Sequence, residues 1–286
     1  QGEAVLHLRP RPPPSGSQGS HRAMAPKVKK SIAKPRKGQA KAKGASPRSS
    51  KATATRSTAA PAPLKGVKAV AINLARRPDR WEKVRHSLAR VAPWLPVERL
   101  DAVDGKAHPP PVKEVTKKWS TAHLASLFHW YKSVTVTMSP GERGCCGSHV
   151  RAWRLAAKRT KPLLVIEDDA VALPAFTGSL AQAMREAPRG TGMIFLSSKD
   201  RGTPKPAGKV LMEPYFVWTT VGYLIYPAAA RTLLKMLPMD MPVDNFLAWH
   251  IMQGKIKAYS VRPAAVRQAQ TWNVGSDVPH SDDVAH

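Results

Sequence analysis

Apolar residues recur with two different spacings from position 67 onward. Short runs rich in Val, Ile, Leu and Ala predict strands at 67–74, 97–105, 163–166, 192–197, 221–226 and 255–261. Apolar positions three or four apart predict helices between them, over 79–91, 227–237 and 244–252. Strands that alternate with helices indicate an α/β fold with a mostly parallel central sheet.

The pattern is weaker between residues 106 and 160. "AHPPPVKEV" indicates a loop, and "SLFHWYKSVTVT" fits a helix, a strand or both. Glycines at 141, 144 and 147 predict a loop, followed by a helix that runs to about Thr160 with Ser148 as its N-cap. The two cysteines, Cys145 and Cys146, are adjacent, so we expect them to pack as small apolar residues without a bridge between them.

Composition separates the first 66 residues from the rest. They hold 15 of the 46 Lys and Arg residues but only one of the 19 acidic residues, in a chain of net charge +27, and show no apolar periodicity. Such a segment buries too little apolar surface to offset its chain entropy. We therefore expect a disordered basic tail over 1–66, rich in Pro, Ala, Lys and Ser, and one folded domain over 67–286.

The basic tail bears on partners and compartment. Lys and Arg attract nucleic-acid phosphates, but the tail also fits a solvated or targeting extension. No zinc-finger or RNP-like pattern accompanies it, so we do not expect nucleic-acid binding as the main function. No signal peptide, transmembrane run or ER-retention motif is visible, so the sequence leaves the compartment open between the cytoplasm and an organelle to which the tail would direct the chain.

Glu167, Asp168 and Asp169 are the only run of three acids, and they directly follow the strand at 163–166. Ligands of α/β sheets gather at the carboxyl ends of strands, and in an extended chain Glu167 and Asp169 face the same side. Carboxylates this close raise each other's pKa unless a cation lies between them. With no Cys or His adjacent in the sequence, oxygen ligands favour Mg²⁺ or Mn²⁺ over zinc. The alternative is a strand-to-helix junction in which the acids cap the next helix.

Several segments carry a resemblance to a known family. "AINLARRPDR", "LDAVDGK", "SPGERGCCGSHVRAW", "LLVIEDDAV", "GYLIYPAAARTLL" and "MPVDNFL" occur in this order. Together they resemble glycosyltransferase family 25, which contains lipopolysaccharide-core sugar transferases and procollagen galactosyltransferases. The resemblance covers about residues 67–277 and is weakest at 108–137 and 197–210, where acceptor recognition would lie. It implies a GT-A-like nucleotide-sugar-binding fold, a UDP-sugar donor, and Mn²⁺ (or Mg²⁺) held by a D-x-D-like element.

Site residues follow from this resemblance. The triplet stands in the D-x-D place with Glu for the first Asp, so Asp169 and then Glu167 would hold the metal. Asp104 either binds ribose or makes the turn before Gly105. Asp244 is the candidate base that deprotonates the acceptor hydroxyl, or else an N-cap. The expected donor-binding residues, several of which also fit a solvated turn or a helix start, are Asn73, Arg76, Arg77, Arg80, Asp104, Gly147, Ser148, His149 and Asp168.

The resemblance thus implies a metal-assisted enzyme that transfers galactose or glucose from a UDP-sugar to a hydroxyl on a glycan, a lipid-linked sugar or a protein. The alternative is a basic nucleic-acid or chromatin-associated protein whose glycosyltransferase-like domain is catalytically inactive. A nucleotide-binding oxidoreductase is disfavoured because no G-x-G-x-x-G follows the first strand. Trp218, Trp249 and Trp272 either stack on sugar rings or pack in the core.

Overall fold

The computed structural model describes residues 59–197 and 199–269. They lie in the second of two units into which the chain divides, Ala54–His286. Ordered structure begins before the predicted boundary at residue 67, because a 3-10 helix (η1, Ala62–Leu64) precedes it and its Leu64 side chain is fully buried. The rest of the predicted tail and Trp272 lie outside the described residues.

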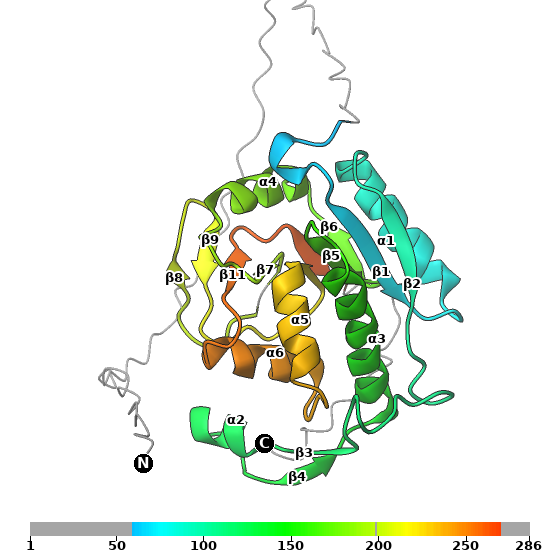
Figure 1. Ribbon diagram of the computed structural model, residues 1–286, viewed down its shortest axis with the longest axis vertical. Coiled ribbons are helices and arrows are strands. Elements are labelled where there is room, and N and C mark those ends of the chain that lie inside the picture. The colour runs from blue at the N-terminus through cyan, green and yellow to red at the C-terminus, as the bar shows by residue number, and fades with distance from the viewer. Residues whose placement is uncertain (1–58, 198, 270–286) are drawn as a thin grey trace, which may run out of the picture. The chain divides into compact units, whose positions relative to one another are not determined.

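A sheet of eight strands runs through the domain in the order β2-β1-β5-β10-β7-β11-β9-β8 (Figure 1). Two-stranded ribbons, β12-β6 and β3-β4, accompany it. Each long apolar run of the sequence supplies one central strand, as predicted. The strands are β1 (Lys68–Asn73), β2 (Val97–Asp101), β3 (Lys118–Ser120), β4 (Thr135–Thr137), β5 (Leu163–Glu167), β6 (Ala170–Ala172), β7 (Met193–Phe195), β8 (Lys205–Pro206), β9 (Leu211–Glu213), β10 (Gly222–Ile225), β11 (Ala258–Val261) and β12 (Val266–Gln268).

The α/β class is confirmed, but the sheet is mixed rather than mostly parallel. Strands β2, β1 and β5 pair in parallel, as do β7 and β11. Strand β10 is antiparallel to both of its neighbours, β5 and β7. The prediction of another parallel strand at 221–226 is therefore wrong. A continuous apolar run indicates a strand that is buried on both faces, and it carries no information about direction.

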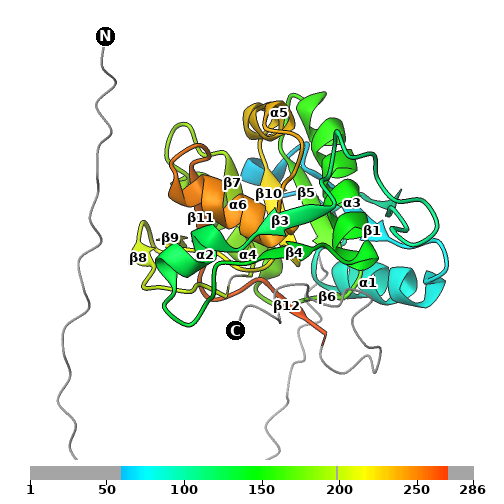
Figure 2. The ribbon, with the colours of Figure 1, turned by 90° about the horizontal axis from the view of Figure 1, so that it is seen from below.

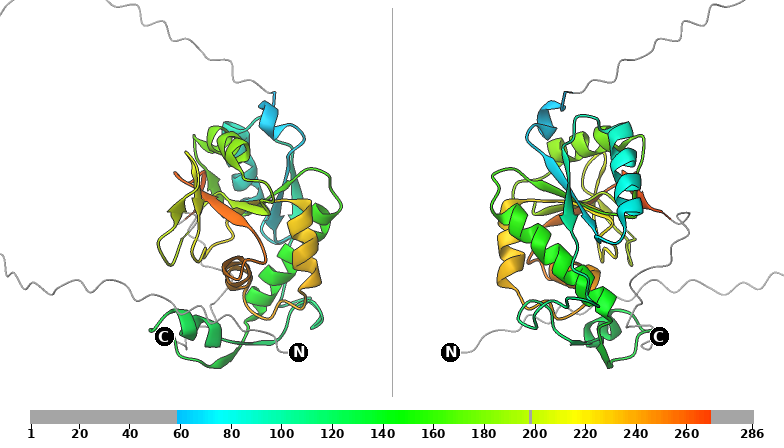
Figure 3. Two further views of the ribbon diagram at one scale, coloured as in Figure 1. Left: turned by 60° about the vertical axis from the view of Figure 1, so that its left-hand side comes forward. Right: turned by 90° about the vertical axis from the view of Figure 1, so that its right-hand side faces the viewer.

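Helices cover both faces of the sheet (Figures 1 and 3). One face packs against α3, α5 and α6, and the other packs against α1, α4 and the β12-β6 ribbon. Alternation along each strand produces the two cores, so Val70 and Ile72 face one layer and Ala69 and Ala71 face the other. The helices are α1 (Pro78–Val91), α2 (Ala122–Leu127), α3 (Pro140–Ala157), α4 (Phe176–Glu186), α5 (Pro227–Lys235) and α6 (Val243–Met252).

The ambiguous stretch before α3 is partly helix and partly strand. Residues 126–137 contain the end of α2 and all of β4. Together with β3, these elements lie beside α6 in Figures 1 and 2 and bury Trp119 and Phe128 in the same core as that helix. None of the helices described here is long and apolar enough to span a bilayer.

Helix α3 starts nine residues earlier than predicted, at Pro140 instead of after Ser148. Its N-cap is Ser139, whose hydroxyl accepts a hydrogen bond from the Glu142 amide while the Glu142 carboxylate accepts one from the Ser139 amide. Gly144 and Gly147 therefore lie inside a helix. A Cβ on Gly144 would lie 2.6 Å from the Val103 carbonyl oxygen, so glycine is needed here for close packing and not for a loop.

Candidate functional site

The polar residues of the site gather where β1 and β5 end. Because these strands are parallel, with Ile72 opposite Glu167, Asn73 and the acidic triplet lie at the same edge of the sheet. The antiparallel direction of β10 brings its amino end, preceded by Thr220, to this edge as well. Ribbon β12-β6 adds Gln268, which pairs with Ala170 immediately after the triplet.

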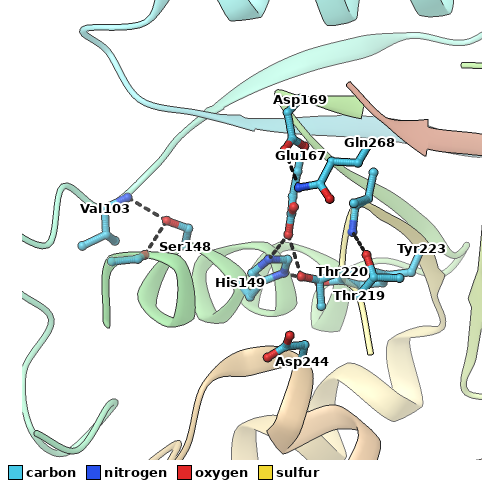
Figure 4. Close-up of polar contacts among 12 residues, drawn as sticks. Val103, Ser148, His149, Glu167, Asp169, Thr219, Thr220, Tyr223, Asp244 and Gln268 are labelled. Atoms are coloured by element: carbon cyan, nitrogen blue, oxygen red, sulfur yellow. Dashed lines mark hydrogen bonds and ion pairs between the residues drawn. The ribbon is translucent and has the colours of Figure 1, made fainter. Parts of the chain in front are cut away.

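The sequence argument assumed that the chain stays extended through the acidic triplet, and this assumption is wrong. The chain turns at Asp168 and Asp169, and each of the three side chains finds separate partners. Glu167 Oε1 accepts a hydrogen bond of 2.6 Å from the Thr220 hydroxyl and lies 3.2 Å from His149 Nε2 (Figure 4). Burial alone would raise the pKa of Glu167, but the bonds with His149 and Thr220 outweigh it and lower this pKa.

Asp168 is held by two partners from the β1–α1 segment. Asn73 donates to Asp168 Oδ2 at 2.8 Å, and Arg80 contacts Oδ1 at 3.3 Å. Burial raises the pKa of Asp168, and the Asn73 and Arg80 contacts only partly oppose that rise. These contacts fix the turn between Glu167 and Asp169, and a donor contact by Asp168 stays a prediction.

Asp169 has one carboxylate oxygen paired and one without a partner. Gln268 donates to Oδ2 at 2.8 Å (Figure 4), whereas Oδ1 is buried and accepts no hydrogen bond from any described residue. Burial, followed by the charge of Glu167, raises the pKa of Asp169 to about 6. A buried, incompletely paired carboxylate beside a second one fits a bound cation.

His149 and Cys145 adjoin the triplet from α3. His149 is fully buried, and its Nδ1 lies 2.7 Å from the Tyr223 hydroxyl, which also accepts a bond from Trp153 Nε1 at 3.1 Å. The ligand atoms of Cys145, His149 and Glu167 lie within 4.8 Å of one another. The sequence argument against sulfur and nitrogen ligands therefore fails, because the fold makes neighbours of residues that are distant in the sequence.

The two cysteines differ in their surroundings. Cys146 is fully buried with its thiol 3.7 Å from the Met241 carbonyl oxygen, so its prediction as a small apolar residue is confirmed. Cys145 also packs against the core but is only partly buried. Burial, then the charge of Glu167, raises the pKa of the Cys145 thiol well above its usual value, and Asp244 adds to this effect.

Asp244 lies in the first turn of α6 (Figure 4). The N-cap position belongs to Pro242, so the alternative role of Asp244 as an N-cap is wrong. Its Oδ1 accepts a bond of 2.9 Å from the Asn245 amide. Figure 4 shows Asp244 on the side of the site that faces α3, and its charge helps to raise the pKa of both cysteine thiols. Its role as the base stays a prediction.

The predicted arginines all contact carboxylates of the chain itself. Arg76 pairs with Asp104, Arg77 makes two bonds of 3.0 Å to Asp79, and Arg80 pairs with Asp168. Donor contacts by these arginines stay predictions.

Asp104 makes the turn that its sequence suggested. Its Oδ1 accepts a bond of 3.0 Å from the Lys106 amide, the largest of the contributions that lower its pKa. The structure does not test whether Asp104 also binds ribose.

Gly147 and Ser148 lie under the segment that contains Val103. The Ser148 hydroxyl donates to the Gly144 carbonyl at 2.7 Å and accepts from the Val103 amide at 2.8 Å (Figure 4). A Cβ on Gly147 would lie 3.2 Å from Val103 and Pro110 side-chain carbons. Neither these residues nor His149 stands at a helix N-terminus, so the helix start predicted at Ser148 is wrong. Their donor contacts stay predictions.

Comparison with known proteins gives a match that covers the triplet. Residues 67–201 match the family model described as Glycosyltransferase family 25 (LPS biosynthesis protein). The resemblance to glycosyltransferase family 25 is confirmed. The match includes His149 and Glu167 but ends before Thr220, Asp244 and Gln268.

Curated family 25 proteins are similar to the chain over part of their length. A glycosyltransferase 25 family member of Drosophila pseudoobscura pseudoobscura is 29% identical over 187 residues, 62% of this chain and 28% of that protein. A probable inactive glycosyltransferase 25 family member 3 of Bos taurus is 30% identical over 215 residues, 67% and 35% respectively. Procollagen galactosyltransferase 1-B of Xenopus laevis is 25% identical over 218 residues, 67% and 34%. The chain spans about a third of the length of these relatives.

Sequence reasoning about the site missed three residues: Thr220, Tyr223 and Gln268. Each of them contacts a site residue that lies 53 to 99 positions away in the sequence, so no local sequence pattern predicts the contact. Of the tryptophans, Trp218 lies under the Arg201 guanidinium, 3.7 Å from the ring centroid, and Trp249 lies edge-on to His123. Both are partly buried against the core, which supports the packing alternative for them.

Proposed function

We propose that the domain is a metal-assisted glycosyltransferase with a GT-A-like donor site. It transfers a hexose, galactose or glucose, from a UDP-sugar to a hydroxyl on a glycan, a lipid-linked sugar or a protein. The observation that carries the proposal is Asp169, whose buried Oδ1 has no partner among the described residues and whose pKa is raised to about 6 beside Glu167. A divalent ion would supply the charge that this pair of carboxylates requires.

In this proposal Glu167 and Asp169 hold Mn²⁺ or Mg²⁺. When bound, such an ion neutralises the donor diphosphate and stabilises the charge that develops on the leaving UDP. The surrounding residues hold the two carboxylates in place. Thr220 and His149 orient Glu167, and Gln268 orients Asp169.

Asp244 is the proposed base on the acceptor side. A carboxylate is suited to remove the proton from an acceptor hydroxyl as that oxygen attacks the sugar carbon in a single displacement. The position of Asp244 in the first turn of α6, with its charge acting on Cys145, supports this role because it brings a carboxylate from outside the triplet toward the site.

A donor screen tests the proposal. UDP release is measured from UDP-galactose and UDP-glucose, with and without Mn²⁺ or Mg²⁺. We expect metal-dependent release that Asp169→Asn and Asp244→Asn both reduce by at least about a hundredfold. Glu98→Gln is the matched control, because Glu98 is an exposed carboxylate on β2 whose ion-pair partner is Lys68. Full activity of Asp169→Asn would contradict the metal assignment.

The names of some relatives suggest a second outcome of the same screen, in which the domain binds UDP without catalysis. The Bos taurus protein is described as a probable inactive family member, and a Homo sapiens protein that is 30% identical over 187 residues is described as an inactive one. Calorimetric titration with UDP and Mn²⁺ therefore belongs beside the activity assay. Metal-dependent binding of UDP without release from any donor would replace the enzyme by a nucleotide-sugar-binding module.

A further inference from the structure

We propose that Cys145, His149 and Glu167 form a binding site for a borderline divalent cation, with Zn²⁺ as the expected ion. Cys145 and His149 are four residues apart on α3, so they share one face of the helix. Glu167 meets them from the end of β5, and the three ligand atoms lie within 4.8 Å of one another. This site has a different ligand set from the oxygen site proposed above, although the two sites share Glu167.

The ligand types select the ion. A thiolate, an imidazole nitrogen and a carboxylate oxygen form a set that suits Zn²⁺ far better than Mg²⁺ or Mn²⁺. Zn–S and Zn–N bonds of about 2.3 and 2.0 Å place tetrahedral ligand atoms about 3.5 Å apart. His149 Nε2 and Glu167 Oε1 are already 3.2 Å apart, so only the Cys145 thiol would have to approach them, by at most about 1.3 Å.

Buried partners hold two of the three ligands in orientation. The Tyr223 hydroxyl engages His149 Nδ1 at 2.7 Å, which turns Nε2 toward Glu167, and Trp153 holds that hydroxyl from behind. The Thr220 hydroxyl holds Glu167 Oε1 at 2.6 Å. Hydrogen bonds of this kind behind the ligands are typical of protein zinc sites and distinguish this cluster from a chance encounter of side chains.

Three protein ligands leave a fourth position of a tetrahedral ion open. Cys145 is only partly buried, and the Glu167 side chain is 22% exposed, so this position can take water or an oxygen of a bound molecule. Because both sites use Glu167, we also expect Zn²⁺ to inhibit Mn²⁺-dependent UDP release. That consequence rests on the proposed function, whereas zinc binding itself does not.

Cobalt provides a direct test, because a thiolate bound to Co²⁺ gives a sulfur-to-metal charge-transfer band in the near ultraviolet. The full chain, kept reduced, is titrated with Co²⁺ and then with Zn²⁺. We expect the band in the wild type, its displacement by Zn²⁺, and its loss in Cys145→Ala. Cys146→Ala is the matched control and keeps the band, because the Cys146 thiol points to the Met241 carbonyl. A wild type without the band, or Cys145→Ala with it, overturns the proposal.

Equilibrium dialysis with Zn²⁺ gives the affinity and separates the two proposals. Cys145→Ala and His149→Ala should each weaken Zn²⁺ binding by at least about tenfold, with circular dichroism showing that both variants fold. Thr220→Val keeps every ligand and should weaken Zn²⁺ binding by a smaller factor. Asp169→Asn should keep the cobalt band, because Asp169 is not a ligand of this site. If the chain shows the cobalt band but releases no UDP with any metal, the zinc site is supported and the proposed enzyme activity is contradicted. Unchanged Zn²⁺ affinity in Cys145→Ala contradicts the zinc site and leaves the proposed enzyme activity untouched.

Discussion

Asp169 shows most directly how one residue can be recognised in the sequence while its chemistry depends on the fold. The sequence placed it in an acidic run after a buried strand and predicted that it would crowd a second carboxylate. The buried oxygen without a hydrogen bond follows instead from the turn at 168–169 and from Gln268, 99 positions away. A local pattern identifies residue types, but burial and pairing depend on contacts that only the folded chain makes.

The raised pKa of Asp169 predicts a pH-dependent cost in the metal-free protein. Its pKa is about 6 in the folded chain, against an ordinary value of 3.8, so the folded state binds this proton more tightly. The free energy of unfolding therefore falls as the pH rises from about 4 to about 6. Asp169→Asn avoids this cost, and in EDTA at pH 7.5 it should be more stable than the wild type by at most about 3 kcal/mol.

Urea unfolding at pH 4 and pH 7.5 measures this effect. The difference between Asp169→Asn and the wild type should shrink toward zero at pH 4, where both side chains are neutral. Saturating Mn²⁺ should reverse the order at pH 7.5, because the ion stabilises only the folded protein that binds it. Equal destabilisation by Asp169→Asn at both pH values would contradict the assignment of a raised pKa to Asp169.

At the scale of elements, the start of helix α3 could not be predicted from the sequence pattern. Strands such as β1 and β5 and helices such as α1 follow from their apolar spacing within a few residues. The glycines of α3 predicted a loop because glycine is a poor helix former. Tertiary packing overrides that preference, since the loop around Val103 and Gly105 crosses the helix too closely for a side chain at Gly144.

The same argument predicts opposite effects of one substitution in two helices. Gly178 lies in α4 with no atom within 4 Å of an added Cβ, so Gly178→Ala should stabilise the protein by about 1 kcal/mol. An added Cβ at Gly144 would lie 2.6 Å from a backbone oxygen, so Gly144→Ala should destabilise it by about 1–3 kcal/mol. Thermal unfolding of both variants measures the pair. Stabilisation by both substitutions would contradict the prediction, because it would show that the segment around Val103 moves away from an added Cβ at Gly144 without cost.

At the scale of the whole molecule, the reversal of β10 assembles the site. If β10 ran parallel to β5, as its apolar run suggested, Thr220 would lie at the opposite edge of the sheet from Glu167. The α/β class was predictable because strand and helix periodicities alternate along the chain. Strand direction was not, because it depends on which connection packs best over the finished sheet.

The division of the chain into two units predicts that donor binding and any nucleic-acid binding can be separated. Removal of residues 1–53 takes away 13 basic residues and one acidic residue and lowers the net charge from +27 to +15. Every described contact of the acidic triplet lies in the second unit, so we expect a chain of residues 54–286 to bind UDP in the presence of Mn²⁺ as tightly as the full chain does, within about twofold.

Affinity of the full chain for DNA or RNA, where present, should fall steeply with salt and be largely lost on truncation, because phosphate contacts release counterions. Calorimetry with UDP and filter binding at two salt concentrations measure the two effects on the same pair of proteins. Loss of UDP binding on truncation would contradict the independence of the second unit, and salt-sensitive nucleic-acid binding as the only activity of the full chain would favour a basic binding protein over the proposed enzyme.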